Sequence, residues 1–117
     1  MIYVIDDDIS VRRAFEFFLE SAELEYQSFE SATSFLSGMK PTVNDLLVLD
    51  LYMPGMSGED LLKKFKSEGL LIPVIVVTAF DDPQSREYCM QYGVKAYMRK
   101  PVDGEALIDF INYSMSL

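Results

Sequence analysis

The sequence predicts an α/β domain built on an open, parallel β-sheet with helices on both faces. Short segments that are apolar almost throughout alternate along the chain with longer segments whose apolar residues recur every three or four positions. Runs that are apolar on both faces are typical of buried parallel strands, and the longer spacing is typical of amphipathic helices. Strict alternation of the two implies parallel strands joined by right-handed helical crossovers.

Five strands are expected from the apolar runs. Three of the runs, IYVI, LLVLD and PVIVVTA, are nearly continuous and have strand length. Two weaker segments complete the set. The strands are expected at residues 2–6, 25–29, 45–50, 73–78 and 94–99.

Five amphipathic helices are expected between and after these strands, at residues 9–22, 31–38, 57–67, 82–92 and 103–115. Ser31 and Ser57 are predicted to be helix N-caps, because their hydroxyls can accept hydrogen bonds from the first free amides of a helix. Gly38, Gly69 and Gly93 follow helical segments, where a left-handed residue commonly ends a helix.

Five βα units are too few for an eight-stranded barrel, so we expect a doubly wound, flavodoxin-like (βα)5 sheet with strand order 2-1-3-4-5. A chain of 117 residues has the size of one domain, expected at 1–117 with no further domain. No apolar run reaches the roughly 20 residues of a membrane span, and no basic segment resembles the start of a signal peptide.

The charge balance excludes several classes of function. The chain has 19 acidic and 10 basic residues, no histidine and a net charge of −9. We therefore expect no direct binding to nucleic acid or anionic membranes, and no chemistry that uses a histidine base or ligand. The single cysteine, Cys89, precludes an internal disulfide and fits a cytoplasmic location.

Charged and polar side chains close four of the five predicted strands, on the edge where such sheets bind ligands. In chain order they are Asp6, Asp7, Asp8, Asp50, Thr78 and Lys100. Adjacent carboxylates repel one another by about 1 kcal/mol per pair at ~4 Å even in water, so either solvent, in an exposed loop or cap, or a cation, in a binding site, is expected to offset them.

This set of residues has a chemical logic. Carboxylates are suited to hold Mg²⁺, and Asp50 fits a carboxylate nucleophile that accepts a phosphoryl group. Lys100 and the metal ion would neutralise the charge on that group. Asp8 is assigned to the start of the following helix, where a carboxylate is favoured, and not to the metal site.

With these residues placed, the whole chain resembles the receiver domains of two-component response regulators. The resemblance rests on four motifs in order: VIDDD (4–8), LVLDLYMPGMSG (47–58), VIVVTA (74–79) and AYMRKP (96–101). The wording MPGMSG and the earlier SFESATSFL are similar to the FixJ-like regulators, whose receivers precede a helix-turn-helix DNA-binding output domain.

The resemblance implies a role for each residue of the site. It implies that Asp50 is the phosphoacceptor. Asp6 and Asp7 would hold Mg²⁺ together with Asp50 and the backbone carbonyl of Tyr52.

The resemblance also implies how the switch works. Thr78 and Lys100 would contact the phosphoryl oxygens, and Tyr97 would change its rotamer on activation. The bond between Lys100 and Pro101 would be cis. The bulky Tyr52 would contribute to slow autodephosphorylation, together with the equally bulky Phe80.

The implied partners follow from the same family. A sensor histidine kinase would donate the phosphoryl group, and the face formed by residues 82–92, 94–99 and 103–115 would then change shape. The expected outcome is homodimerisation through that face or control of a tethered DNA-binding domain. The domain would not be a dedicated enzyme, because its autophosphorylation and autodephosphorylation activities would be limited.

Three alternatives remain at this point. A haloacid-dehalogenase-like phosphatase could use Asp6 as nucleophile in an Asp-x-Asp motif, although Ser10 departs from its usual continuation and the chain lacks room for a cap domain. A pseudo-receiver would act only as a binding module, but would typically have lost one of the site residues. A flavodoxin would need a phosphate loop where this chain has three acids.

Overall fold

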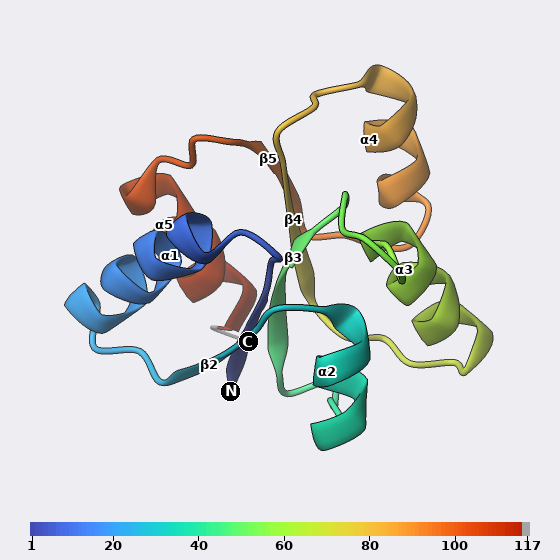
Figure 1. Cartoon of the computed structure of the whole chain (residues 1–117), viewed down its shortest axis with the longest axis horizontal. Coiled ribbons are helices and arrows are strands. Elements are labelled where there is room, and N and C mark those ends of the chain that lie inside the picture. The colour runs from blue at the N-terminus through green and yellow to red at the C-terminus, as the bar shows by residue number, and fades with distance from the viewer. Residues whose placement is uncertain (116–117) are drawn as a thin grey trace.

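The computed structural model describes residues 1–115 and contains five strands and five helices in strict alternation (Figure 1). The strands are β1 (Ile2–Ile5), β2 (Tyr26–Phe29), β3 (Leu46–Asp50), β4 (Val74–Thr78) and β5 (Ala96–Arg99). The helices are α1 (Ile9–Ser21), α2 (Ala32–Gly38), α3 (Gly58–Ser67), α4 (Pro83–Met90) and α5 (Gly104–Met115). Residues 116–117 of the expected domain lie outside the described part.

All strands are parallel and run in the order β2-β1-β3-β4-β5, which confirms the predicted fold class and topology. Helices α1 and α5 cover one face of the sheet, and α2, α3 and α4 cover the other (Figure 1). The chain passes from β1 to the edge strand β2 and then returns to the other side of β1. The strand order therefore reverses between β1 and β3, where ligand sites form in such sheets.

The sheet separates two hydrophobic cores, and its central strands contribute to both. In β3, Leu47 and Leu49 pack into the core beneath α2 and α3, whereas Leu46 and Val48 pack into the core beneath α1 and α5. Because successive strand residues point to opposite faces, both sets are buried. This explains why the central strands are apolar at nearly every position.

Four of the five helices begin one residue later than predicted. In three of them, α2, α3 and α4, the N-cap residue explains the difference. Ser31, Ser57 and Asp82 have extended backbones and are N-caps, so each helix begins at the following residue. Each cap side chain accepts a hydrogen bond from a backbone amide of the first turn, and Ser57 forms a reciprocal capping box with Asp60. The cap assignments of Ser31 and Ser57 are confirmed.

The glycine predictions were correct at two of three helix ends. Gly69 and Gly93 have φ values of 70° and 74°, in the left-handed region. The prediction for Gly38 was wrong. Gly38 is the last residue of α2, and the residue that follows the helix, Met39, has an extended backbone. None of the helices described has the length and apolar character needed to cross a membrane.

Candidate functional site

The predicted acidic residues meet at the carboxyl edge of the sheet. Ile5 of β1 pairs with Leu49 of β3, so the next residues along each strand, Asp6 and Asp50, are neighbours. One carboxylate oxygen from each of Asp6, Asp7 and Asp50 lies within 4.8 Å of the others. Asp6 and Asp50 are buried, while Asp7 is exposed. The fold therefore forces two carboxylates into a desolvated position beside a third.

Lys100, which directly follows the edge strand β5, reaches this cluster. The ammonium of Lys100 lies 2.8 Å from Oδ2 of Asp6 and 3.5 Å from Oδ1 of Asp50. The Lys100 amide also donates a hydrogen bond of 2.8 Å to the carbonyl of Thr78, which ties the segment after β5 to the end of β4. The peptide bond between Lys100 and Pro101 is cis.

The charges of the cluster are not balanced by protein groups alone. Burial, together with the negative charge of Asp6, raises the pKa of Asp50 to about 7, against the opposing effect of Lys100. Burial lowers the pKa of Lys100, but contact with Asp6 and Asp50 more than reverses this, so its pKa is raised. One ammonium thus faces two buried carboxylates and a third at the rim.

The donor set fits a small divalent cation. Oδ2 of Asp6 is buried, and among the described residues no donor forms a hydrogen bond of good geometry with it. It forms an ion pair of 2.8 Å with the Lys100 ammonium. Hard carboxylate oxygens with an exposed side are the ligands that Mg²⁺ prefers. Tyr52 belongs to the same neighbourhood, because its amide donates a hydrogen bond of 3.3 Å to Oδ1 of Asp50.

Asp8 has the structural role expected for it. Its side chain accepts hydrogen bonds from the amides of Ser10 and Val11, and so caps α1. Its own amide donates a hydrogen bond of 2.9 Å to Oδ1 of Asp6. Asp8 therefore fixes the orientation of a site carboxylate through its backbone, while its carboxylate serves the helix.

Thr78 is buried at the end of β4, but its hydroxyl is engaged within its own loop. The hydroxyl accepts a hydrogen bond of 3.1 Å from the Phe80 amide and donates one of 3.3 Å to the Phe80 carbonyl. To donate a hydrogen bond to an oxygen on Asp50, the Thr78 hydroxyl would have to give up its bond to the Phe80 carbonyl.

Tyr97 lies on the edge strand β5, with its hydroxyl buried. Burial raises the pKa of this hydroxyl. The guanidinium of Arg86 from α4 lies 5.1 Å from the centre of the Tyr97 ring, and Arg86 is also paired with Asp81 at 3.1 Å. Tyr97 thus connects β5 with α4 and with the loop that follows Thr78.

Two residues that shape this site were not singled out from the sequence. A Cβ atom at Gly58 would lie 2.4 Å from the carbonyl oxygen of Asp50, so this position requires glycine, and the MPGMSG motif carries that signal. Ser85 is buried on α4, and its hydroxyl lies 3.0 Å from that of Tyr52. A serine inside a helical segment gives no sequence signal for such a contact.

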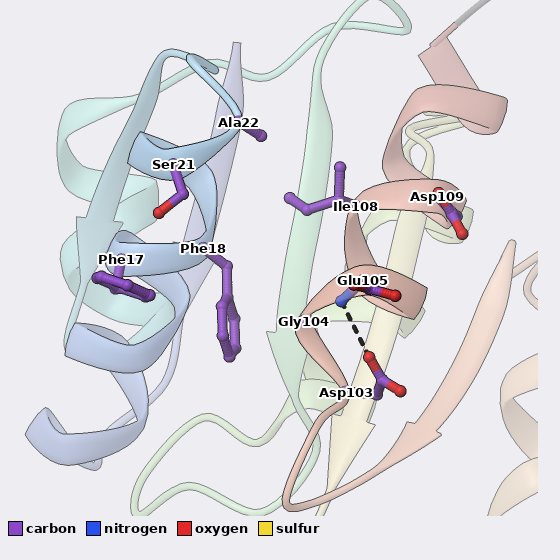
Figure 2. Close-up of a pocket in the computed structure, with 9 residues that line it drawn as sticks. All are labelled: Phe17, Phe18, Ser21, Ala22, Asp103, Gly104, Glu105, Ile108 and Asp109. Carbon is purple, nitrogen blue, oxygen red and sulfur yellow. Dashed lines mark hydrogen bonds between the residues drawn. The ribbon is translucent and has the colours of Figure 1, made fainter.

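A separate hollow of about 620 Å³ lies between α1 and α5 (Figure 2). Phe17 and Phe18 line it on the α1 side, with their rings 6.1 Å apart. Phe17 is 66% exposed. A Cβ at Gly104 would lie 2.6 Å from the Phe18 ring, so glycine permits the close approach of α5 to α1.

The sequence matches the profile of the response regulator receiver domain over residues 2–112. It is 36% identical over 114 residues to the transcriptional regulatory protein FixJ of Azorhizobium caulinodans, covering 97% of this chain and 54% of FixJ. It is 33% identical over 116 residues to the DNA-binding transcriptional regulator NtrC of Salmonella typhimurium, covering 99% of this chain and 25% of NtrC. The chain thus spans about half or less of these relatives.

Solved structures give the same result. The response regulator StyR superposes with a TM-score of 0.89 at 35% identity, covering 98% of this chain and 58% of StyR. The structure of FixJ-N superposes with a TM-score of 0.86 at 30% identity, covering 98% of this chain and 92% of FixJ-N. The phosphatase and flavodoxin alternatives are not favoured by these matches. The chain belongs to the response regulator receiver domain family.

Proposed function

We propose that this chain is a Mg²⁺-dependent phosphorylation switch in which Asp50 accepts the phosphoryl group. The observation that supports this most directly is the Lys100 ammonium placed against two buried carboxylates, Asp6 and Asp50, beside the exposed Asp7. The domain is regulatory rather than catalytic, and its capacity to phosphorylate and dephosphorylate itself is limited.

The proposed transfer uses few groups. A carboxylate oxygen of Asp50 forms a bond to phosphorus while the P–N bond of a phosphohistidine on a sensor kinase breaks. Asp6, Asp7, Asp50 and the Tyr52 carbonyl would hold Mg²⁺, which when bound neutralises charge on the transferring group. Lys100 contacts the phosphoryl oxygens as they arrive.

The proposed output begins at Thr78. Its hydroxyl exchanges the bond it donates to the Phe80 carbonyl for one to a phosphoryl oxygen, and the loop between β4 and α4 moves inward. Because the Tyr97 hydroxyl is already buried, the change at Tyr97 is a shift of its ring relative to Arg86. A local charge change thereby biases a two-state element.

The face formed by α4, β5 and α5 is the proposed site of homodimerisation. It carries exposed apolar side chains, with Met90 48% and Phe110 42% exposed. The FixJ and NtrC relatives are transcriptional regulators, which supports a tethered DNA-binding output domain in the natural protein and a cytoplasmic location. The domain itself, with a net charge of −9, is not expected to bind DNA.

Phosphorylation by acetyl phosphate or phosphoramidate in Mg²⁺, followed by intact-mass measurement, tests this function. We expect one phosphoryl mass on the wild type, none on Asp50→Ala and little on Asp6→Ala. Asp8→Ala is the matched control, because it removes an acid of the same run that caps α1. No gain in the wild type would indicate a pseudo-receiver. A gain that survives in Asp50→Ala but not in Asp6→Ala would restore the phosphatase alternative.

A further inference from the structure

Tyr52 is tethered at three points between Asp50 and α4, one through its backbone and two through its side chain. Its amide donates to Oδ1 of Asp50 at 3.3 Å. Its ring packs edge to face on Phe80, with centroids 5.5 Å apart and planes at 89°. Its hydroxyl lies 3.0 Å from that of Ser85. One residue of the loop after β3 therefore contacts Asp50, the loop after β4 and helix α4.

Of these contacts, the bond to Ser85 is the one that anchors the ring to a buried group. Tyr52 is 43% exposed and Phe80 is 66% exposed, so core packing does not fix either ring. Ser85 is only 8% exposed, and it is one of the two buried residues of α4, with Cys89. Without the Ser85 hydroxyl, the Tyr52 ring would be restrained mainly by another exposed ring.

We propose that Ser85 is a positioning residue that holds the Tyr52 ring beside Asp50 and thereby slows hydrolysis of the aspartyl phosphate. The inference rests on the proposed function, since it requires a phosphoryl group on Asp50. In the hydrolysis step, a water oxygen bonds to phosphorus and the bond from phosphorus to the Asp50 oxygen breaks. Inorganic phosphate leaves, and the carboxylate is restored.

The tether gives a simple expectation for the rate. Asp50 is 3% exposed, and the Tyr52–Phe80 pair joins the two loops beside the end of its strand. If water gains access mainly while the Tyr52 ring is turned away, the rate follows the fraction of time the ring is free. Loss of one ordinary hydrogen bond raises that fraction about fivefold. The position of α4 then sets how long the phosphoryl group persists.

The test is the first-order loss of phosphoryl mass, after removal of the donor, at fixed Mg²⁺. Tyr52→Phe and Ser85→Ala are each expected to hydrolyse about fivefold faster than the wild type. The double variant should be no faster than either single variant, because both remove the same bond. The matched control is Tyr92→Phe, which removes a tyrosine hydroxyl that bonds Tyr88 at 3.1 Å near the end of α4. It should retain the wild-type rate.

The outcomes separate this inference from the function on which it rests. Uptake without any difference in hydrolysis among the variants would overturn the role of Ser85 and leave the switch intact. Multiplicative effects of about 25-fold in the double variant would show two independent contributions and also overturn it. An equal acceleration in Tyr92→Phe would assign the effect to general loosening of α4. No phosphoryl uptake by the wild type would overturn the switch itself.

A urea-unfolding cycle on the unphosphorylated wild type, both single variants and the double variant supplies an independent readout. Non-additive changes in stability are expected if the Tyr52–Ser85 bond forms in solution. Additive changes would contradict the contact itself. If the unfolding free energies are non-additive but the hydrolysis rate is unchanged, the role of Ser85 is purely structural. That result would also overturn the inference. Tyr52→Phe keeps the test available if Ser85→Ala fails to fold, because the Tyr52 side chain is partly exposed.

Discussion

The ammonium of Lys100 contacts the fully buried carboxylate of Asp6 at 2.8 Å, although these residues follow the last and the first strands of the sheet. The contact brings together two groups that neither loop would hold in this position alone. The charge balance of the site therefore depends on correct assembly of the sheet from β1 to β5.

Replacement of Lys100 should therefore cost stability. Lys100→Met leaves two buried carboxylates without their cation, and we expect a loss of about 3–5 kcal/mol in metal-free buffer. Urea denaturation in the presence of a chelator measures this. Lys64→Met is the matched control, since Lys64 forms only an exposed pair with Glu68 and should change stability by less than about 1 kcal/mol. Equal effects of the two variants would contradict the interpretation.

Removal of the Asp50 charge should have the opposite effect. Burial and the charge of Asp6 already disfavour the ionised form of Asp50, whose pKa is raised to about 7. Asp50→Asn should therefore raise the melting temperature of the metal-free protein at neutral pH. A lower melting temperature for this variant would show that the Asp50 carboxylate is stabilised by Lys100 more than it is destabilised by burial.

Magnesium should stabilise the folded chain through the acidic cluster. At ten times its dissociation constant, a ligand that binds only the native state adds about 1.4 kcal/mol. We expect the melting temperature of the wild type to rise on titration with Mg²⁺, and that of Asp6→Asn to respond little. Asp8→Asn should respond as the wild type does, because its carboxylate caps α1. A full response in Asp6→Asn would place the metal elsewhere.

Gly58→Ala should be strongly destabilising. Its Cβ would lie 2.4 Å from the Asp50 carbonyl oxygen and 2.8 Å from the Leu51 Cα, and backbone atoms of a central strand have little freedom to move. We expect a loss of at least about 1–3 kcal/mol in urea denaturation. Gly38→Ala is the control, since that Cβ would meet nothing within 4 Å. It should be neutral or stabilising by up to about 1 kcal/mol.

Cys89 should be unreactive in the folded protein. Burial, with a smaller contribution from the charge of Glu59, raises the pKa of its thiol to about 11. Since the thiolate is the reactive form, labelling by iodoacetamide at pH 8 should be slow and should become fast in urea. The folded pKa lies above the ordinary thiol value of 9.0, so stability from the protonated thiol is lost as the pH rises from about 9 through 11. Rapid labelling without urea would indicate that α4 opens readily.

Much of the fold was predictable because its signals are local and repeated. Apolar runs fixed the strands to within two residues, and Ser31 and Ser57 marked helix starts through cap chemistry that depends on a few neighbouring residues. The meeting of Asp6 with Asp50 was also predictable. Parallel strands place their carboxyl ends on one edge, so residues that close adjacent strands become neighbours.

The remaining features depend on packing between distant segments. Nothing near Ser85 in the sequence indicates that its hydroxyl meets Tyr52, 33 residues away. The close approach of Gly104 to the Phe18 ring depends on how α5 lies against α1, which local periodicity does not define. Thr78 was correctly expected at the strand end, but its engagement with Phe80 is set by the path of the following loop.

The position of Asp50 within the sheet has one more consequence. Its strand, β3, is hydrogen-bonded to β1 on one side and β4 on the other, whereas β5, which carries Tyr97, pairs with β4 alone. The strand proposed to receive a new charge is therefore held by two ladders, and the strand expected to respond is held by one. A displacement that passes from Asp50 through Thr78 on β4 would therefore meet less resistance at β5, and would reach the surface proposed for partner binding.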